Sequence, residues 1–301
     1  MFDIIILGSG PAGMAAAIYA KRAKLETMII DRNGFGGGQV LSTYEVDNYP
    51  GIPGVSGMVL SSMFQEHAEK MGATVIGDEV EEIRKNGDFY EVVCSGQSYE
   101  TKGIVIATGA QHAHLNVKGE EELAGMGVSY CATCDGAFFE NRTVAVVGGG
   151  DVAVEDAIFL SRTCKKVYLI HRRDALRAAK VLQDSLFACP NVEILWDTVV
   201  EEIQGQDEVE NIQIRNKSTD EVKTLPLDGV FIAVGILPKS ELFRSMLQCD
   251  ANGYIVAGED GRTSEKGIYA AGDVRTKELR QIVTAVSDGA NAINSYQRDF
   301  I

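Results

Sequence analysis

The stretch Phe2-Asp3-Ile4-Ile5-Ile6-Leu7-Gly8-Ser9-Gly10-Pro11-Ala12-Gly13 decides the fold. Its apolar run Ile4–Leu7 indicates a short buried strand over 2–7, and the Ala-rich segment after it predicts a helix over 11–23. The residues between them fit G-x-G-x-x-G: the first glycine permits a tight turn, the second lets the backbone approach a pyrophosphate, and the third lets the helix pack on the strand.

A second predicted strand over Thr27–Asp31 completes a βαβ unit around this loop. Asp31 ends that strand, where a carboxylate can accept hydrogen bonds from a ribose hydroxyl. A glycine loop alone could be a structural turn. The strand before it, the helix after it and the correctly spaced acid favour a dinucleotide site.

The same pattern restarts in the middle of the chain. We expect a strand over Thr143–Val147, a helix over 153–162 and a strand over Lys166–Ile170. The loop Gly148-Gly149-Gly150-Asp151-Val152-Ala153 fits G-x-G-x-x-A. After the second strand the chain reads His171-Arg172-Arg173, with Arg177 close behind, where the first unit has an acid. Arginine suits the 2′-phosphate of NADPH; the alternative is a solvated basic face, which three clustered arginines in an acidic chain make less attractive.

Cys131-Ala132-Thr133-Cys134 precedes the second loop. A structural zinc site usually needs two such pairs, and Cys94, Cys164, Cys189 and Cys249 are isolated in sequence, so we expect no metal. An inert buried pair remains open but has no need of this spacing, whereas a redox pair can form a reversible disulfide and lower a thiol pKa. Asp135 follows the pair as a candidate proton carrier or as a helix N-cap.

Composition restricts the function classes. The 301 residues allow one large or two medium domains. A net charge of -15 argues against nucleic-acid and anionic-lipid partners. No apolar run reaches membrane-spanning length, the first strand is too short for a signal peptide, and the sparse cysteines favour a reducing cytoplasm.

The rest of the chain adds further expected elements. They are a helix over 58–72, paired strands over Val75–Ile83 and Tyr90–Cys94, a buried strand ending at Ala107-Thr108-Gly109, strand-rich sequence over 192–235, and a final helix over about 281–296. Gly272-Asp273 follows an apolar strand, so Asp273 is a candidate partner for a ribityl or phosphate oxygen.

Together with further segments, these motifs resemble low-molecular-weight thioredoxin reductases over nearly the whole chain. The additional segments are Gly37-Gly38-Gln39, Asp47-Asn48-Tyr49-Pro50-Gly51, Gly272-Asp273-Val274 and Arg280-Gln281-Ile282-Val283-Thr284-Ala285. The resemblance implies an α/β protein of two Rossmann-like, three-layer β/β/α domains. A discontinuous FAD domain at 1–113 and 240–301 would hold an inserted NADPH domain at 114–239, with switch segments near 110–118 and 235–239 as hinges.

The resemblance also implies site residues. For FAD they are Gly8, Ser9, Gly10, Pro11, Ala12, Gly13, Asp31, Arg32, Gly38, Gln39, Asn48, Ala107, Thr108, Gly109, Gly272, Asp273, Arg280, Gln281 and Ile282. For NADPH they are Gly148, Gly149, Gly150, Asp151, Val152, Ala153, His171, Arg172, Arg173 and Arg177. The catalytic residues would be Cys131, which attacks the substrate disulfide, Cys134, which lies nearer the flavin, and Asp135.

The activity implied is a cytoplasmic, homodimeric flavoprotein oxidoreductase, which passes electrons from NADPH through FAD and the Cys131–Cys134 disulfide to thioredoxin. Two departures stand out: Val152 replaces a usual small polar residue, and Asp31 a usual Glu. The alternatives are a ferredoxin-linked or other flavin-dependent disulfide reductase, for example one serving a peroxiredoxin-type partner, a flavin–NADP reductase, and a non-catalytic dinucleotide sensor. The last two would need no cysteine pair.

Overall fold

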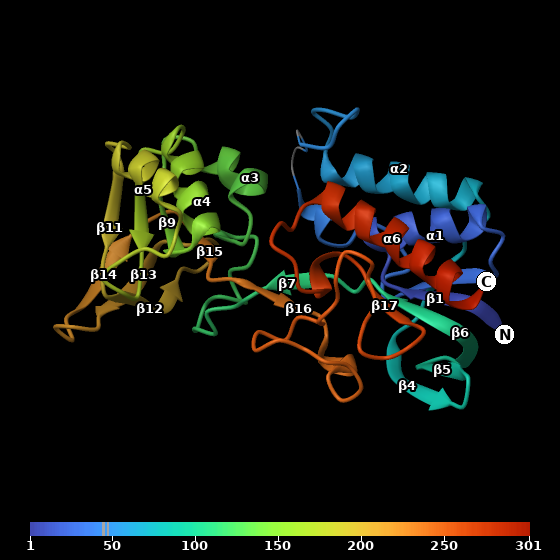
Figure 1. The fold of residues 1–301 in the computed structure, drawn as a ribbon. Helices are drawn as coiled ribbons and strands as arrows, with labels where there is room; N and C mark the ends of the chain where they lie inside the picture. Colours follow the sequence, from blue (N-terminus) through green and yellow to red (C-terminus); the bar gives the residue numbers. More distant parts are fainter. Residues whose placement is uncertain (44–45, 47) are drawn as a thin grey trace. The chain divides into compact units, whose positions relative to one another are not determined.

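The computed structural model describes residues 1–43, 46 and 48–301, without the side chains of Ser42 and Cys134. The chain forms two compact units. The first comprises Met1–Gln111 and Leu237–Ile301, and the second comprises His112–Ile236. The second unit is therefore a continuous insertion between two segments of the first (Figure 1).

The first unit is built on one seven-stranded sheet, in the order β3-β2-β1-β6-β5-β4, with β17 also paired to β6. Its strands are β1 (Phe2–Leu7), β2 (Thr27–Asp31), β3 (Val75–Gly77), β4 (Val80–Asn86), β5 (Phe89–Cys94), β6 (Ser98–Ile106) and β17 (Ile268–Ala270). Strands β3, β2, β1, β6 and β17 pair in parallel, whereas β4 and β5 join by antiparallel pairing.

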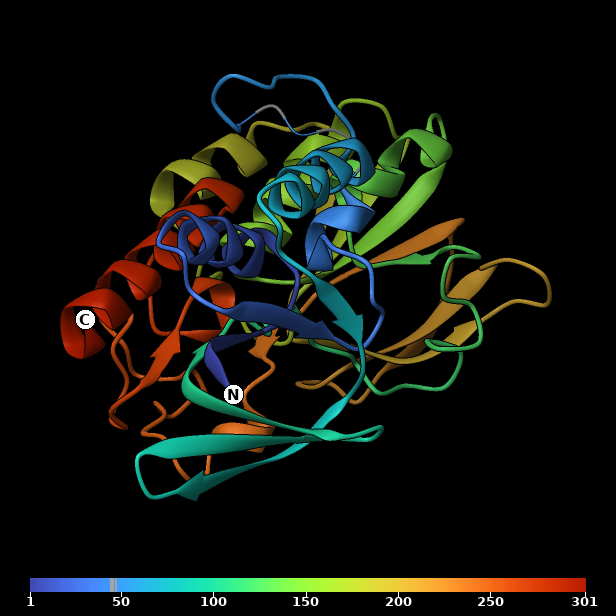
Figure 2. The same ribbon diagram turned by 90° about the vertical axis from the view of Figure 1, so that its right-hand side faces the viewer.

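Three helices lie on one side of this sheet (Figures 1 and 2). They are α1 (Pro11–Arg22), α2 (Gly57–Lys70) and α6 (Ile282–Phe300). Because successive side chains of a strand point to opposite faces, Ile4 and Ile6 of β1 pack with α1 and α6. Ile5 and Leu7 pack on the other face, with residues that include Phe243. Both faces of β1 are thus buried over Ile4–Leu7, its apolar run.

Short 3-10 turns complete the first unit. They are η1 (Gly38–Ser42), η3 (Glu241–Phe243) and η4 (Gly272–Val274). Helix α1 starts with Pro11 at its first turn, where the absent N–H costs nothing. Its packing on α6 is close, because a Cβ at Gly289 of α6 would lie 2.1 Å from the Ala12 carbonyl oxygen.

The predicted pairing with Tyr90–Cys94 is confirmed, but the single strand expected over Val75–Ile83 is wrong. The structure has two strands here, of which β3 pairs in parallel with β2 and β4 pairs with β5. The break falls at Asp78, whose carboxylate accepts the N–H groups of Glu79 at 2.8 Å and Gly96 at 3.3 Å. Such a side-chain bond to nearby backbone competes with the sheet ladder and turns the chain.

The second unit is a three-layer arrangement. Its central sheet is parallel, in the order β11-β10-β9-β15-β8. The strands are β8 (Val128–Ser129), β9 (Thr143–Gly148), β10 (Lys166–Ile170), β11 (Val192–Leu195) and β15 (Gly229–Ala233). An antiparallel sheet of β12 (Thr198–Gln204), β13 (Asn211–Asn216) and β14 (Val222–Pro226) packs on one face.

Helices cover the other face of this central sheet. They are α3 (Ala132–Asp135), followed by the 3-10 turn η2 (Gly136–Phe139), α4 (Asp151–Ser161) and α5 (Lys180–Phe187). Two further strands, β7 (Ala110–His112) and β16 (Ile236–Pro238), form a two-stranded sheet. Within the described residues, no helix combines the length and apolar character needed to cross a bilayer.

Candidate functional site

The first glycine loop is shaped by contacts that exclude side chains. Gly8 has φ +103°, and a Cβ there would lie 2.4 Å from the Ala107 carbonyl oxygen. A Cβ at Gly13 would lie 1.9 Å from the Gly8 carbonyl oxygen. At Gly10 the nearest atom to a Cβ would be the Gly37 carbonyl oxygen, at 3.9 Å. Gly8 and Gly13 therefore serve packing, while Gly10 leaves room at the N-terminus of α1, where helix amides favour phosphate.

Asp31 lies beside this loop, as its position at the end of β2 predicted. Its Oδ2 accepts the Ser9 N–H at 2.9 Å and the Ser9 hydroxyl at 2.7 Å, while Oδ1 accepts the Asn33 N–H at 3.0 Å. A carboxylate oxygen has more than one lone pair, so Asp31 can fix the loop and still accept a ribose hydroxyl. Arg32 instead points to the surface and pairs with Glu79 at 3.5 Å.

Other predicted FAD positions come together from distant parts of the chain. Asn48 Nδ2 donates to Gln281 Oε1 at 2.8 Å, across 233 positions of sequence. Thr108 Oγ1 donates to the Lys239 carbonyl at 2.7 Å. The remaining members of this group are Gly38 and Gln39 in η1, Ala107 and Gly109 after β6, and Ile282 at the start of α6. Asp47 lies outside the described residues.

Four buried polar atoms in the first unit lack partners among the residues that the structure describes: Thr27 Oγ1, Ser61 Oγ, Asp273 Oδ1 and Arg280 Nε. The last two belong to predicted FAD residues. Burial raises the pKa of Asp273, although the nearby positive charges of Lys277 and Arg280 act to lower it. The Arg280 guanidinium stacks over the Tyr254 ring, 4.0 Å from its centroid. Since unpaired buried polar atoms are costly, these two atoms fit a polar ligand such as a flavin nucleotide.

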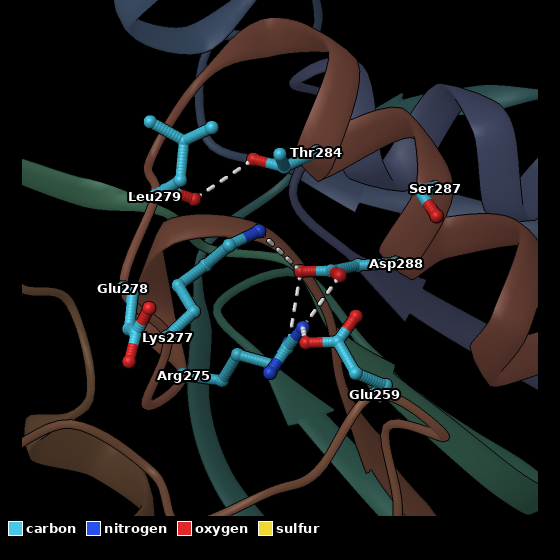
Figure 3. A pocket seen from close by; sticks show the side chains of 8 residues that line it. All are labelled: Glu259, Arg275, Lys277, Glu278, Leu279, Thr284, Ser287 and Asp288. Carbon is cyan, nitrogen blue, oxygen red and sulfur yellow. Dashed lines mark hydrogen bonds and ion pairs between the residues drawn. The ribbon is translucent and has the colours of Figure 1, made fainter.

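A buried ion cluster adjoins the turn η4, which contains Asp273, and lines a cavity of about 470 Å³ (Figure 3). Asp288 of α6 accepts the Gly272 N–H at 2.8 Å, Arg275 Nη2 at 2.7 Å and Lys277 Nζ at 2.8 Å. Burial alone would raise the pKa of Asp288, but hydrogen bonds from Arg275 and Lys277 outweigh it and lower that pKa. Asp288 thus ties α6 to the Gly272-Asp273 turn.

The second glycine loop, in the second unit, is also shaped by close contacts that exclude side chains. A Cβ at Gly148 would lie 2.3 Å from the Ala233 carbonyl oxygen, and one at Gly149 would lie 2.1 Å from His171 Nδ1. A Cβ at Gly150 would meet nothing within 4 Å. The loop is therefore packed at its first two glycines and open at its third, at the start of α4. Asp151 accepts the Ala179 N–H at 2.7 Å, and Val152 is exposed while Ala153 is buried.

The predicted 2′-phosphate residues lie beside this loop. The Arg177 N–H donates to the Gly149 carbonyl at 2.8 Å. Arg172, Arg173 and Arg177 are exposed, and none makes an ion pair with a described side chain. His171 is buried and its Nε2 lies 3.0 Å from the Ala175 carbonyl, so the imidazole supports the loop from behind. Three uncompensated guanidinium groups at this position suit an anionic ligand.

The dithiol segment starts the short helix α3 in the same unit. Cys131 is disulfide-bonded, and its Sγ lies 3.4 Å from Thr133 Oγ1. The Cys134 side chain, for which we predicted the flavin-facing role, lies outside the described residues. Cys94, Cys164, Cys189 and Cys249 are free. No cluster of potential metal ligands occurs among the residues described.

Asp135 occupies the N-cap position of η2, one of its two predicted roles, but its carboxylate makes no capping hydrogen bond there. Instead Oδ2 accepts the Ser129 hydroxyl at 2.6 Å. Ser129 is not among the predicted site residues, because nothing in its spacing marks it. Asp288 is not among them either, although a charged residue on the apolar face of a helix signals a buried partner.

Comparison with known proteins identifies relatives over the whole chain. The profile of the pyridine nucleotide-disulphide oxidoreductase family matches residues 2–289. A thioredoxin reductase of Listeria innocua is 46% identical over 299 residues, covering 99% of this chain and 93% of that protein.

Two solved structures agree with this relationship. The Lactococcus lactis thioredoxin reductase has a TM-score of 0.84 and 41% identity, covering 99% of this chain and 98% of that one. The Streptococcus pyogenes thioredoxin reductase has a TM-score of 0.77 and 47% identity, covering 100% and 99%. The resemblance predicted from the motifs and the α/β fold with two Rossmann-like sheets are both confirmed.

Proposed function

Because the chain belongs to the pyridine nucleotide-disulphide oxidoreductase family, we propose that it is an NADPH-dependent thioredoxin-disulfide reductase with bound FAD. The observation that carries this proposal is the disulfide at Cys131, in the unit whose glycine loop is flanked by unpaired arginines. A stable disulfide at a C-x-x-C motif needs a nearby source of electrons to turn over, and an arginine-flanked loop suits the nucleotide that carries them.

In this proposal the first unit binds FAD. Gly10 offers the close backbone approach to the pyrophosphate, and Asp31 accepts a ribose hydroxyl. Asp273 and Arg280 each supply a buried polar atom that has no partner among the described residues. Bound FAD would accept a hydride from NADPH and return two electrons to the disulfide.

The second unit binds NADPH and carries the dithiol. Arg172 and Arg177 hold the 2′-phosphate, and the N-terminus of α4 faces the pyrophosphate. In the reduced pair, Cys131 attacks the thioredoxin disulfide, and Cys134 then attacks Cys131 Sγ and releases reduced thioredoxin. Asp135 carries the proton between the sulfur that attacks and the sulfur that leaves. We propose that the segments near 110–118 and 235–239 let the dithiol serve both partners in turn.

We further propose that the protein acts in the cytoplasm as a homodimer. A reducing compartment keeps a redox pair cycling instead of locked as a structural bridge. Support for a dimer comes from α2, whose Met58, Val59 and Met63 are exposed, because exposed apolar side chains gathered on one helix mark an interaction surface.

The test uses FAD-reconstituted protein with Cys131→Ser and Cys134→Ser variants. Each variant should lose NADPH-dependent reduction of thioredoxin, while NADPH still bleaches the visible flavin absorbance in a stopped-flow instrument. Cys249→Ser, which removes a free and half-buried thiol, is the matched control and should keep full turnover.

Three outcomes would count against the proposal. A polypeptide that takes up no flavin would remove the FAD site. Full thioredoxin turnover in either cysteine variant would remove the relay order. Absent bleaching by NADPH, with turnover restored by reduced ferredoxin, would show a ferredoxin-linked reductase instead.

A further inference from the structure

A single hydroxyl group connects the two ends of the dithiol segment. Ser129 is 5% exposed and ends the edge strand β8. Its Oγ accepts the Cys131 N–H at 3.0 Å and donates to Asp135 Oδ2 at 2.6 Å. The alternative acceptor, the Cys131 carbonyl, is farther away at 3.3 Å. Since a serine carries one hydroxyl proton, the shorter contact to Asp135 takes it.

The Ser129–Asp135 contact has the length of a hydroxyl bonded to a carboxylate, which is among the stronger hydrogen bonds of proteins. It occupies Oδ2 and leaves Oδ1, which accepts no hydrogen bond from any described residue. One oxygen of Asp135 is therefore fixed and the other is available to hold a proton.

Ser129 is itself held from both sides. Its backbone pairs with Phe231 of β15. The next residue, Tyr130, donates its hydroxyl to Glu120 at 2.8 Å and stacks with His112. Glu120 is 1% exposed and also accepts the N–H groups of Leu115 and Asn116. Burial would raise the pKa of Glu120, but hydrogen bonds from Tyr130 and these backbone groups outweigh it and lower that pKa.

We propose that Ser129 is a positioning residue for Asp135, and that Tyr130 and Glu120 anchor it. This inference rests on the proposed disulfide reductase function. Ser129 does not touch the substrate. It sets the direction of the Asp135 carboxylate relative to the Cys131 disulfide, so that Oδ1 takes a proton from the attacking thiol and gives it to the departing sulfur.

The first test opens the disulfide chemically, with no need for NADPH or thioredoxin. One thiol of dithiothreitol gives up its proton and bonds as a thiolate to one sulfur of the Cys131 disulfide. The disulfide S–S bond breaks, and the other sulfur leaves with the electron pair and takes a proton. The second thiol then closes dithiothreitol to its cyclic disulfide, so the reagent is oxidised and the protein pair becomes two thiols. The rate is followed in oxidised holoenzyme by iodoacetamide trapping and mass spectrometry.

The variants are Ser129→Ala, Ser129→Thr, Asp135→Asn and the double variant Ser129→Ala/Asp135→Asn. We expect Ser129→Ala to slow opening about tenfold, since a hydrogen bond to a charged group is worth roughly that factor or more. Ser129→Thr keeps the hydroxyl and should restore the rate to within about threefold. The double variant should be no slower than Asp135→Asn alone, because coupled residues are not additive.

Thr198→Val is the matched control. Thr198 is also buried in this unit, and its hydroxyl donates to the Trp196 carbonyl at 2.7 Å. The control loses a buried hydroxyl of the same kind without touching the dithiol segment, so it should open at the wild-type rate. Melting temperatures of all variants separate lost stability from lost positioning.

The second test measures thioredoxin turnover in the same set. Ser129→Ala should lower kcat and leave KM for thioredoxin unchanged. The inference would be overturned if Ser129→Ala opened the disulfide at the wild-type rate and kept the wild-type kcat. It would also be overturned if the rate losses of Ser129→Ala and Asp135→Asn multiplied in the double variant. If wild-type protein reduced no thioredoxin but the opening rates kept this pattern, the proposed function would fail and the positioning role would stand.

Discussion

At the scale of single residues, we expect coenzyme choice to depend on Arg172 and Arg177. Both side chains are exposed and unpaired with described residues, and Arg177 is tied to the glycine loop through its backbone. Each charge-assisted bond to the 2′-phosphate contributes roughly 1.5–3 kcal/mol. The Arg172→Ala/Arg177→Ala variant should therefore raise KM for NADPH at least about tenfold and leave KM for NADH nearly unchanged, as measured by steady-state kinetics.

Arg162→Ala provides the control, because Arg162 is exposed in the same unit and makes no ion pair with a described residue. It should leave both constants unchanged. Equal increases for NADPH and NADH in the double variant would remove the 2′-phosphate assignment.

At the scale of elements, helix α6 is joined to the Gly272-Asp273 turn by the buried carboxylate of Asp288. Asp288→Asn would leave the nearly inaccessible Lys277 without its anion, and Arg275 with only the exposed Glu259, 2.9 Å away. Removing one partner of a buried pair costs roughly 3–5 kcal/mol, so urea unfolding at pH 7 should show a loss of that size. Glu278→Gln, at an exposed position of the same cavity, should change stability by less than about 0.5 kcal/mol.

The Asp288 carboxylate makes the stability difference between wild type and Asp288→Asn depend on pH. The folded-state pKa of Asp288 is lowered, so its contribution is fully present above the unfolded-state pKa, about 3.9. It is lost as the pH falls through the lower folded-state pKa. The stability gap between wild type and Asp288→Asn should therefore narrow below about pH 4. A gap that stayed constant in acid would contradict this account.

Element by element, the sequence predicted what depends on local pattern. Both glycine loops and their flanking strands follow from apolar runs and from glycines that local packing requires. The prediction of one strand over Val75–Ile83 was wrong because the carboxylate of Asp78 bonds to nearby backbone and turns the chain there. Ser129 and Asp288 escaped prediction for a different reason: their partners are fixed by tertiary packing, which no spacing rule describes. The Asn48–Gln281 bond, across 233 positions, belongs to the same class.

At the scale of the whole molecule, we expect self-association through α2. Met58 is 62% exposed, and Val59 and Met63 lie one turn apart on the same face of the helix. A Met58→Glu/Met63→Glu variant places charges on this surface, which disfavours its burial. Sedimentation velocity should show a dimer for the wild type and a monomer for the variant. Val222→Glu, on the exposed strand β14, should remain dimeric. An unchanged sedimentation coefficient in the α2 variant would place the interface elsewhere.

The interrupted first unit has a consequence for biosynthesis. Helices α1 and α6 pack together, yet about 260 residues separate Arg22 from Ile282. At roughly 5–20 residues per second, a ribosome needs tens of seconds to make the intervening chain. During that interval the nascent polypeptide contains the first strands and α1 without α6, while the inserted second unit can already fold. The packing of α1 against α6 can therefore be completed only after the final helix has been synthesised.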